Sequence, residues 1–126
     1  MTKNELRFAS GSVHGGVLVI TILVERIRDA ETSYALRDEI LSLIDGATVG
    51  HVVFDLRRVT FMGSAGFLAF LAVRRHLEVG RIVFCNISRP VRDMFEVCRL
   101  ISKNPSMTAV FEAEDTLEAA LARLSA

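Results

Sequence analysis

The sequence has no excess of charge of either sign and no long apolar run. Both absences reduce the classes of function that we expect for it. Fifteen basic residues balance fifteen acidic ones over 126 residues, so the formal net charge is zero. A neutral chain gives no general reason to expect nucleic acid or an anionic membrane as its partner. The longest apolar run, VLVITILV at residues 17–24, is far shorter than the about 20 residues of a membrane span, so we expect no membrane insertion.

Cysteine and histidine are scarce and widely spaced. Cys85 and Cys98 form no CxxC pair, and each lies in an apolar segment, which predicts two buried, reduced thiols. The histidines, His14, His51 and His76, lack the spacing of metal ligands. The first eight residues, MTKNELRF, lack the apolar core of a secretion signal. We therefore expect a cytoplasmic protein with no metal and no cofactor.

The composition is that of a folded protein. Hydrophobic residues make up 51% of the chain and charged residues 24%. This length suits one hydrophobic core, and no linker or repeat interrupts it. We expect residues 1–126 to form a single domain.

The N-terminal part predicts a hairpin followed by a helix. Residues 6–13 and 17–24 are typical of two strands, and the His-Gly-Gly between them of a tight turn. Apolar residues then recur at helical spacing. Asp29 or Thr32 can cap the start of this helix, and Gly46 can end it.

The remaining chain alternates between strands and helices. Residues 51–56 and 81–87 predict strands covered on both faces, as in a parallel sheet. The loop 57–63 leads from the first of these strands into a helix that Gly80 ends, and Ser88 with Pro90 opens another helix.

The C-terminal part predicts one more strand and one more helix. Residues 108–111 are typical of a short strand, and residues 116–124 of a helix that opens with a capping box of Asp115 and Glu118. Alternation of this kind predicts an α/β fold. The sheet should be mixed but mostly parallel, with an antiparallel N-terminal hairpin and about four helices packed on it.

The segment FMGSAGF, residues 61–67, gathers small residues where a strand passes into a helix. In an open α/β sheet, ligands and partners meet the fold at this edge. Ser64 is placed to cap the helix, and Gly63 permits a tight backbone. Ala65 and Gly66 leave the first turn bare, so that its free N–H groups suit an anion.

The same segment lacks the motifs of catalysis and nucleotide binding. A nucleophile elbow reads G-x-S-x-G, but Met62 stands two residues before Ser64. Neither GxxxxGK[ST] nor GxGxxG occurs in the sequence. We therefore expect no catalytic residues and no enzyme activity.

Four segments together resemble the STAS domain family, the fold of the anti-sigma-factor antagonists. VVFDLRRVTFMGSAGFLAFL is similar to the family signature, in which an apolar strand, Asp-Leu and a loop precede Phe-Ile/Met-Asp-Ser-Ser-Gly and an apolar helix. Asp29 lies as in the family's Leu-Asp turn. NISRPVRDMFEVCRL and VFEAEDTLEAAL are similar to the family's third helix and to its closing strand and helix.

The resemblance implies a switch protein that is not an enzyme. Family members of this kind bind an anti-sigma factor that is also a serine kinase, which frees the sigma factor. The kinase phosphorylates the Ser or Thr before the family's glycine, and a phosphatase reverses the modification. A phosphate adds roughly −1.5 to −2 charges, and a helix N-terminus tolerates that charge. The modification should therefore block docking without unfolding the helix.

This sequence departs from the family pattern at the switch. Ala65 stands before Gly66 and has no hydroxyl, while Gly63 replaces the motif's Asp. Arg26 replaces the glycine of the family's Gly-x-Leu-Asp turn, and Arg28 precedes Asp29. The resemblance thus implies a cytoplasmic antagonist that binds an anti-sigma factor through the family's docking face but lacks the phosphorylation site that the kinase uses.

The expected docking face combines Asp29 and its turn, the loop 60–66 and exposed residues of the following helix. Its residues are Asp29, Thr60, Met62, Gly63, Ser64, Ala65, Gly66 and Phe67.

Three alternatives stay open at this point. The switch can sit one residue earlier, at Ser64, about 100° around a helix axis from the usual position. The domain can instead be a structural subunit of a lipid-transport or stress-signalling complex. Asp29, Ser64 and free helix N–H groups can also form a small polar pocket for a ligand, although both side chains can simply cap helices. The sequence leaves the oligomeric state open.

Overall fold

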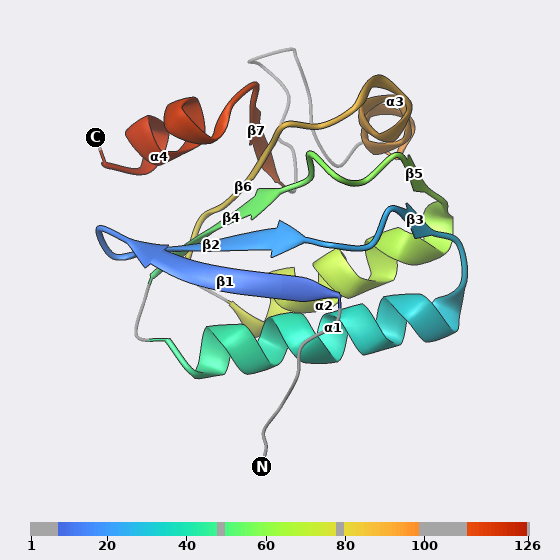
Figure 1. The fold of residues 1–126 in the computed structure, drawn as a ribbon, viewed down its shortest axis with the longest axis horizontal. Coiled ribbons are helices and arrows are strands. Elements are labelled where there is room, and N and C mark those ends of the chain that lie inside the picture. Colours follow the sequence, from blue (N-terminus) through green and yellow to red (C-terminus); the bar gives the residue numbers. More distant parts are fainter. Residues whose placement is uncertain (1–7, 48–49, 78–79, 99–110, 126) are drawn as a thin grey trace.

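The fold is built on a five-stranded sheet of mixed direction. A computed structural model describes residues 8–47, 50–77, 80–98 and 111–125. The strand order is β1-β2-β4-β6-β7, in which β1 and β2 are antiparallel and the other neighbours are parallel (Figure 1). The strands are β1 (Ala9–His14), β2 (Val17–Ile22), β4 (His51–Asp55), β6 (Ile82–Cys85) and β7 (Glu112–Glu114).

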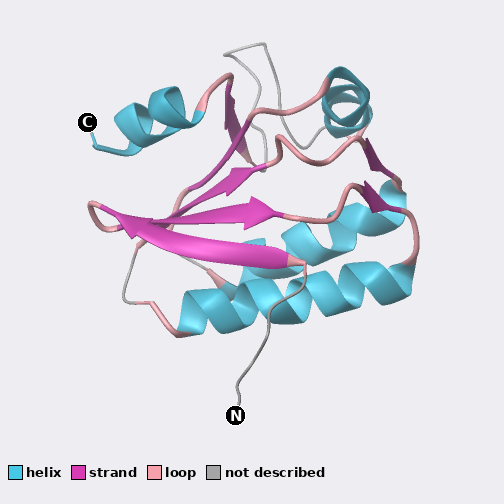
Figure 2. Ribbon diagram, in the orientation of Figure 1, coloured by secondary structure: helices cyan, strands magenta, loops and turns pink. Residues whose placement is uncertain are grey.

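Four α-helices within the described residues cover this sheet. α1 (Ala30–Asp45) and α2 (Phe67–His76) lie side by side on one face, and α4 (Leu117–Ser125) lies on the other (Figure 2). α3 (Arg89–Val97) lies beyond the carboxyl ends of the parallel strands. The predicted α/β class, with a mostly parallel sheet and an antiparallel hairpin, is confirmed.

The parallel strands are buried on both faces, which explains their nearly continuous apolar sequences. Alternate residues of β4 point to opposite sides, so that Val52 and Phe54 face the core under α1 and α2 while Val53 faces the core under α4. Strand β6 divides in the same way, with Phe84 on the first side and Cys85 on the second. One sheet therefore separates two hydrophobic cores.

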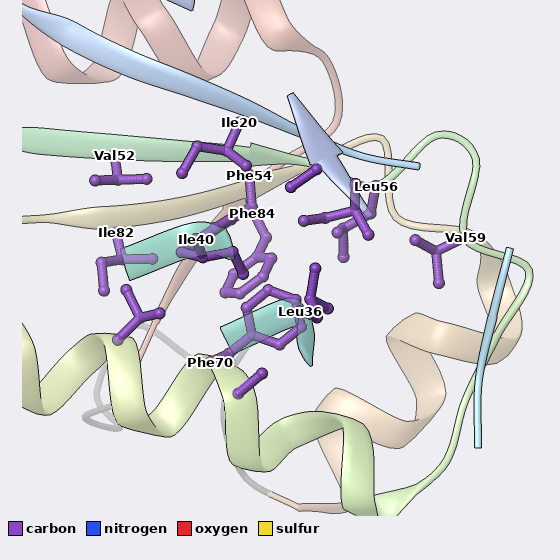
Figure 3. Packing of buried hydrophobic residues seen from close by; sticks show 14 of the residues in the cluster. Ile20, Leu36, Ile40, Val52, Phe54, Leu56, Val59, Phe70, Ile82 and Phe84 are labelled. Carbon is purple, nitrogen blue, oxygen red and sulfur yellow. The ribbon is translucent and has the colours of Figure 1, made fainter. Parts of the chain in front are cut away.

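Phenylalanine rings form the centre of the larger core. Phe84 contacts the rings of Phe54 and Phe70 at centroid distances of 5.2 and 5.1 Å. Phe95 and Phe111 also pack on Phe84, at 4.8 and 5.0 Å. Figure 3 shows Phe54, Phe70 and Phe84 between the sheet and the helices. The cluster ties β4, β6, α2 and α3 to one another.

The hairpin turn follows the prediction from its glycines. Gly15 and Gly16 have φ values of 57° and 82°, and they join His14 to Val17 in a two-residue loop. Two successive positive φ values define the turn type that matches the twist of a hairpin. Glycine adopts them without the steric cost that another residue would incur.

Several predicted boundaries were wrong. α2 ends at His76 and not at Gly80, and Gly80 is required instead because an added Cβ would lie 2.0 Å from the Gly50 carbonyl oxygen. The last strand is Glu112–Glu114, after the predicted residues 108–111, of which 108–110 lie outside the described residues. Thr116 caps α4 by accepting a bond from the Ala119 N–H, in place of the Asp115 capping box.

The prediction of two buried cysteines was half right. Cys85 is fully buried in β6, where burial and the nearby Asp55 carboxylate raise the pKa of its thiol to about 12. Cys98 is exposed directly after the last residue of α3, where it follows the exposed Val97.

We expect Phe84→Ala to lower the free energy of unfolding by about 3–5 kcal/mol, as removal of a buried phenylalanine ring does. The ring is fully buried and touches four others. Urea unfolding measures the loss. The matched control is Phe61→Ala, because the Phe61 side chain is 39% exposed, and its cost should stay below about 1 kcal/mol. Equal losses for the two variants would contradict the assignment of the core.

The two thiols should differ sharply in reactivity. An aromatic disulfide reagent at neutral pH should modify Cys98 rapidly and leave Cys85 untouched until the protein unfolds, since only exposed thiolates react. Absorbance of the released thiol follows the reaction. Cys98→Ser should remove the fast phase; a fast phase that survives this substitution would show that Cys85 is accessible.

Candidate functional site

A short two-stranded ribbon lies beyond the carboxyl ends of the main sheet. β3 (Arg26–Ile27) pairs in parallel with β5 (Phe61–Met62), with Arg26 opposite Phe61 and Ile27 opposite Met62 (Figure 1). The sequence predicted a loop at residues 57–63, and this was wrong for β5. Strands of two residues are too short to produce a visible alternation.

The ribbon has one buried face and one exposed face. Ile27 and Met62 are almost fully buried against the main core. Arg26 and Phe61 are exposed, and the Arg26 guanidinium carbon lies 5.2 Å from the centre of the Phe61 ring. This distance is within the range of a cation–π contact, which holds both side chains on the outer face.

Hydrogen bonds on either side of the ribbon extend it. The Thr60 N–H donates to the Glu25 carbonyl oxygen at 2.8 Å, and the Thr60 hydroxyl donates to the same oxygen at 3.2 Å. The Gly63 N–H donates to the Ile27 carbonyl oxygen at 2.9 Å. The segment from Thr60 to Gly63 is therefore fixed to the turn that precedes α1.

A 3₁₀ turn, η1 (Ser64–Gly66), separates the ribbon from α2. The Gly66 N–H donates to the Gly63 carbonyl oxygen, and the Phe67 N–H donates to that of Ser64. The prediction that Ser64 caps α2 was wrong, because neither η1 nor α2 has a side-chain cap. Ser64 is exposed, and its hydroxyl makes no capping bond to either helix.

Gly66 sets the distance between this turn and the ribbon. An added Cβ would lie 2.5 Å from Met62 Cγ and 3.1 Å from Ile27 Cγ2. Both partners are buried in the core and have little room to move. At Gly63, by contrast, an added Cβ would meet Phe61 and two carbonyl oxygens at 3.7–3.9 Å, which is ordinary contact. Packing therefore requires a glycine at position 66 but not at position 63.

Asp29 ends the neighbouring turn and begins α1. Its carboxylate accepts a 2.7 Å hydrogen bond from the Thr32 N–H, and this bond lowers the pKa of Asp29. Of the two predicted caps, Asp29 is the one used. The Asp29 carboxylate therefore caps α1, whereas Ser64 caps no helix. The hypothesis of a small ligand pocket formed by Asp29, Ser64 and free helix N–H groups stays a prediction.

A buried carboxylate anchors the loop that leads to the ribbon. Asp55 is 1% exposed at the end of β4, and its Oδ1 accepts bonds from the Arg57 N–H and the Asn86 side-chain amide, both at 3.0 Å. Asn86 has a φ of 55°, which asparagine tolerates better than most residues. Ser88 Oγ donates to the Val59 carbonyl oxygen at 3.2 Å. These bonds connect the ends of β4 and β6 to the start of the loop.

The residues of the predicted docking face differ in how far they are exposed to solvent. Asp29, Thr60 and Ser64 are exposed, and Gly63 and Ala65 are half-buried. Met62, Gly66 and Phe67 are buried, so they support the face from below and offer a partner no surface.

The predicted list of docking residues left out the exposed Arg26, Phe61 and Leu68, although the predicted face included the loop 60–66 and exposed residues of the following helix. The side chains of Phe61 and Leu68 are 39% and 45% exposed. For Leu68 the available signal was its position next to Phe67, since neighbouring residues of a helix point in different directions. For Arg26 and Phe61 the two-residue strands carried no such signal.

A family model of the STAS domain matches residues 12–120. The chain belongs to the STAS domain family. Solved structures of anti-sigma-factor antagonists are similar to it over nearly their full length. One from Mycobacterium paratuberculosis is 25% identical with a TM-score of 0.75, and the match covers 94% of this chain and 93% of that one. SpoIIAA in its unphosphorylated form is also 25% identical, with a TM-score of 0.71 and coverage of 93% and 96%.

A phosphorylated relative is also similar to this STAS domain. The Bacillus cell fate determinant SpoIIAA in its phosphorylated form is 25% identical, with a TM-score of 0.63 and coverage of 92% of this chain and 98% of that one.

Within the described part of this STAS domain, no helix has the length and apolar character needed to cross a membrane. The same residues contain no cluster of His, Cys, Asp and Glu that could hold a metal ion.

We expect Gly66→Ala to destabilise the protein by about 1–2 kcal/mol. Overpacking against Met62 costs about 1–3 kcal/mol, and the lower entropy of the unfolded chain offsets about 0.4–1 kcal/mol of this. Urea unfolding provides the measurement. Gly63→Ala is the matched control and should change stability by less than about 0.5 kcal/mol. A Gly66→Ala protein as stable as the control would contradict the close packing at η1.

Proposed function

We propose that this STAS domain is a non-enzymatic regulator that binds an anti-sigma factor of the serine-kinase type and lacks the usual phosphorylation switch. The position of Ala65 carries the proposal. It is the residue before Gly66, where the family pattern places the Ser or Thr that the kinase modifies. Without a hydroxyl at this position, the partner's kinase has no acceptor there.

The exposed side of the ribbon supports a role in protein binding. Phe61 and Leu68 present apolar surface, with Arg26 stacked on the Phe61 ring. Aromatic and arginine side chains are the residues that most often dominate the binding energy of protein interfaces. Because hydrogen bonds from Thr60 and Gly63 hold this segment in place, its backbone would lose little conformational entropy when a partner docks.

The chemistry of the described residues supports a role without catalysis. The buried Asp55 carboxylate is occupied by Arg57 and Asn86, and the raised pKa of Cys85 keeps its thiol protonated at neutral pH. The hydroxyl of Ser64 is exposed, and the three histidines bond instead to Ser12, Asp45 and the Arg81 N–H, so none of them activates it. The site offers contact surface, and its nucleophiles are not activated.

A second possibility is a switch at Ser64, and the exposure of this hydroxyl favours it. Ser64 is not used as a helix cap and is open to a kinase. However, successive residues of a 3₁₀ turn point about 120° apart, so the hydroxyl would face a different direction from one at Ala65. A kinase that is aligned with the usual position would have to accept this displacement.

We expect the wild-type protein to bind a purified serine-kinase anti-sigma factor from its own host and to acquire no phosphate when Mg-ATP is added. Ala65→Ser should become phosphorylated, because it restores the hydroxyl before Gly66. Mass spectrometry of the peptide over residues 59–74 locates the phosphate. If the added hydroxyl needs its usual neighbour, Gly63→Asp can accompany it, since a Cβ fits at Gly63.

Two controls separate the alternatives in this experiment. Ser64→Ala in the Ala65→Ser background should still incorporate phosphate. Stoichiometric phosphate on Ser64 of the wild-type protein would overturn the claim that the switch is missing. Failure of the wild-type protein to bind any such anti-sigma factor of its host would overturn the proposed partner.

A further inference from the structure

The two edges of the main sheet are protected to very different degrees. β1 forms one edge and β7 the other. β7 has three residues, and its Glu112 and Glu114 form ion pairs with Arg81 and Arg123. Short edge strands and charged side chains are the usual defence against pairing with another chain.

β1 has neither defence. It contains six residues, of which Ser10, Gly11, Ser12, Val13 and His14 are exposed, and none of them is an Asp, Glu, Lys or Arg. Val13 is 57% exposed even though it is apolar. A long, uncharged edge strand is a template for the addition of another strand.

The hydrogen-bonding phase of the hairpin defines which backbone groups face outward. The Leu23 N–H donates to the Phe8 carbonyl oxygen, so the even-numbered residues of β1 bond to β2. The Ala9 N–H points away from β2 and donates instead to the Glu39 carboxylate at 3.1 Å. The outward N–H and C=O groups of Gly11 and Val13 remain available, because no described strand pairs with this edge.

The outward N–H and C=O groups of one β1 strand can pair with the same groups of a second copy of the chain. In an antiparallel pair with Gly11 opposite the second copy's Val13, both residues have outward-facing groups, so the two-fold axis generates two hydrogen-bonded pairs. Ser12 then lies opposite Ser12 of the other copy. Each Val13 is brought beside a Gly11 that has no side chain and beside Leu43, whose Cδ2 would be 3.2 Å from a Cβ on Gly11. The apolar side chain of one copy thus covers the bare position of the other.

The geometry points to a homodimer in which the β1 edges of two copies pair antiparallel about Ser12 and join the two sheets into one. The bound partner is a second copy of this chain, because the same two residues, Gly11 and Val13, supply both the bare position and the apolar side chain. The hairpin end of β1 lies at the opposite end of the molecule from β3 and β5 (Figure 1). The dimer therefore leaves the β3–β5 ribbon free and does not depend on the proposed partner.

Disulfide trapping tests the register directly. In this dimer the two Ser12 residues form a non-hydrogen-bonded pair with Cα atoms about 4.5 Å apart, within the about 4.4–6.8 Å range of a disulfide. Ser12→Cys, made in a Cys98→Ser background to remove the exposed native thiol, should form a covalent dimer rapidly under mild oxidation. Non-reducing electrophoresis measures the rate.

Ser10→Cys in the same background is the matched control. It lies on the same face of the same strand, but the two copies of residue 10 would be about 13 Å apart along the paired strands. Its covalent dimer should form at least about ten times more slowly, because this separation exceeds disulfide reach. Equal rates for the two variants, or a faster rate for Ser10→Cys, would overturn the proposed register.

Sedimentation provides a second readout without engineered thiols. The wild-type protein should show a concentration-dependent dimer, and Val13→Lys should weaken it by at least about ten-fold by placing a charge on the edge. Val97→Lys is the control, since Val97 is 76% exposed on α3 and outside the proposed interface. A wild-type monomer at all attainable concentrations would overturn the dimer, as would a dimer that Val13→Lys leaves intact.

Discussion

The contact of Gly66 with Met62 and Ile27 is the constraint on which the candidate site depends. It lets the first turn before α2 approach the buried face of the β3–β5 ribbon more closely than any side chain would permit. The ribbon's outer face, with Arg26 and Phe61, is thereby held beside the exposed Ser64. A glycine at this position is thus a packing requirement, and it positions a surface that consists of other residues.

The rigid parts of the fold lie directly behind this surface. The phenylalanine cluster around Phe84 fixes α2 and α3 against the sheet, and the buried Asp55 fixes the ends of β4 and β6. Loops held by such a scaffold are where proteins commonly place binding residues. The departures from the family pattern, at Arg26, Gly63 and Ala65, lie on this surface or next to it, and none of the three belongs to the buried core.

The sequence predicted the central strands of the main sheet well because each is long enough to show its burial, whereas the three-residue β7 was misplaced. β2, β4 and β6 carry apolar residues on both faces, and the double glycine marks the hairpin. The sequence did not predict β3 and β5, since pairing of two residues depends on tertiary contacts. The Ser64 cap failed for a related reason: local preference favours serine at a helix start, but the 3₁₀ turn displaces the start of α2 to Phe67. The sequence alone likewise did not predict that Met62, Gly66 and Phe67 of the docking face are buried, because their burial depends on tertiary packing.

Hydrogen exchange of the protein with and without a purified serine-kinase anti-sigma factor of its host tests the central claim most directly. Mass spectrometry resolves the exchange by segment. If docking uses the ribbon and the adjoining turn, the partner should slow exchange in residues 25–29 and 60–68 and leave β7 and α4 unchanged. A complex that protects β7 and α4, with no change in the two ribbon segments, would contradict this account.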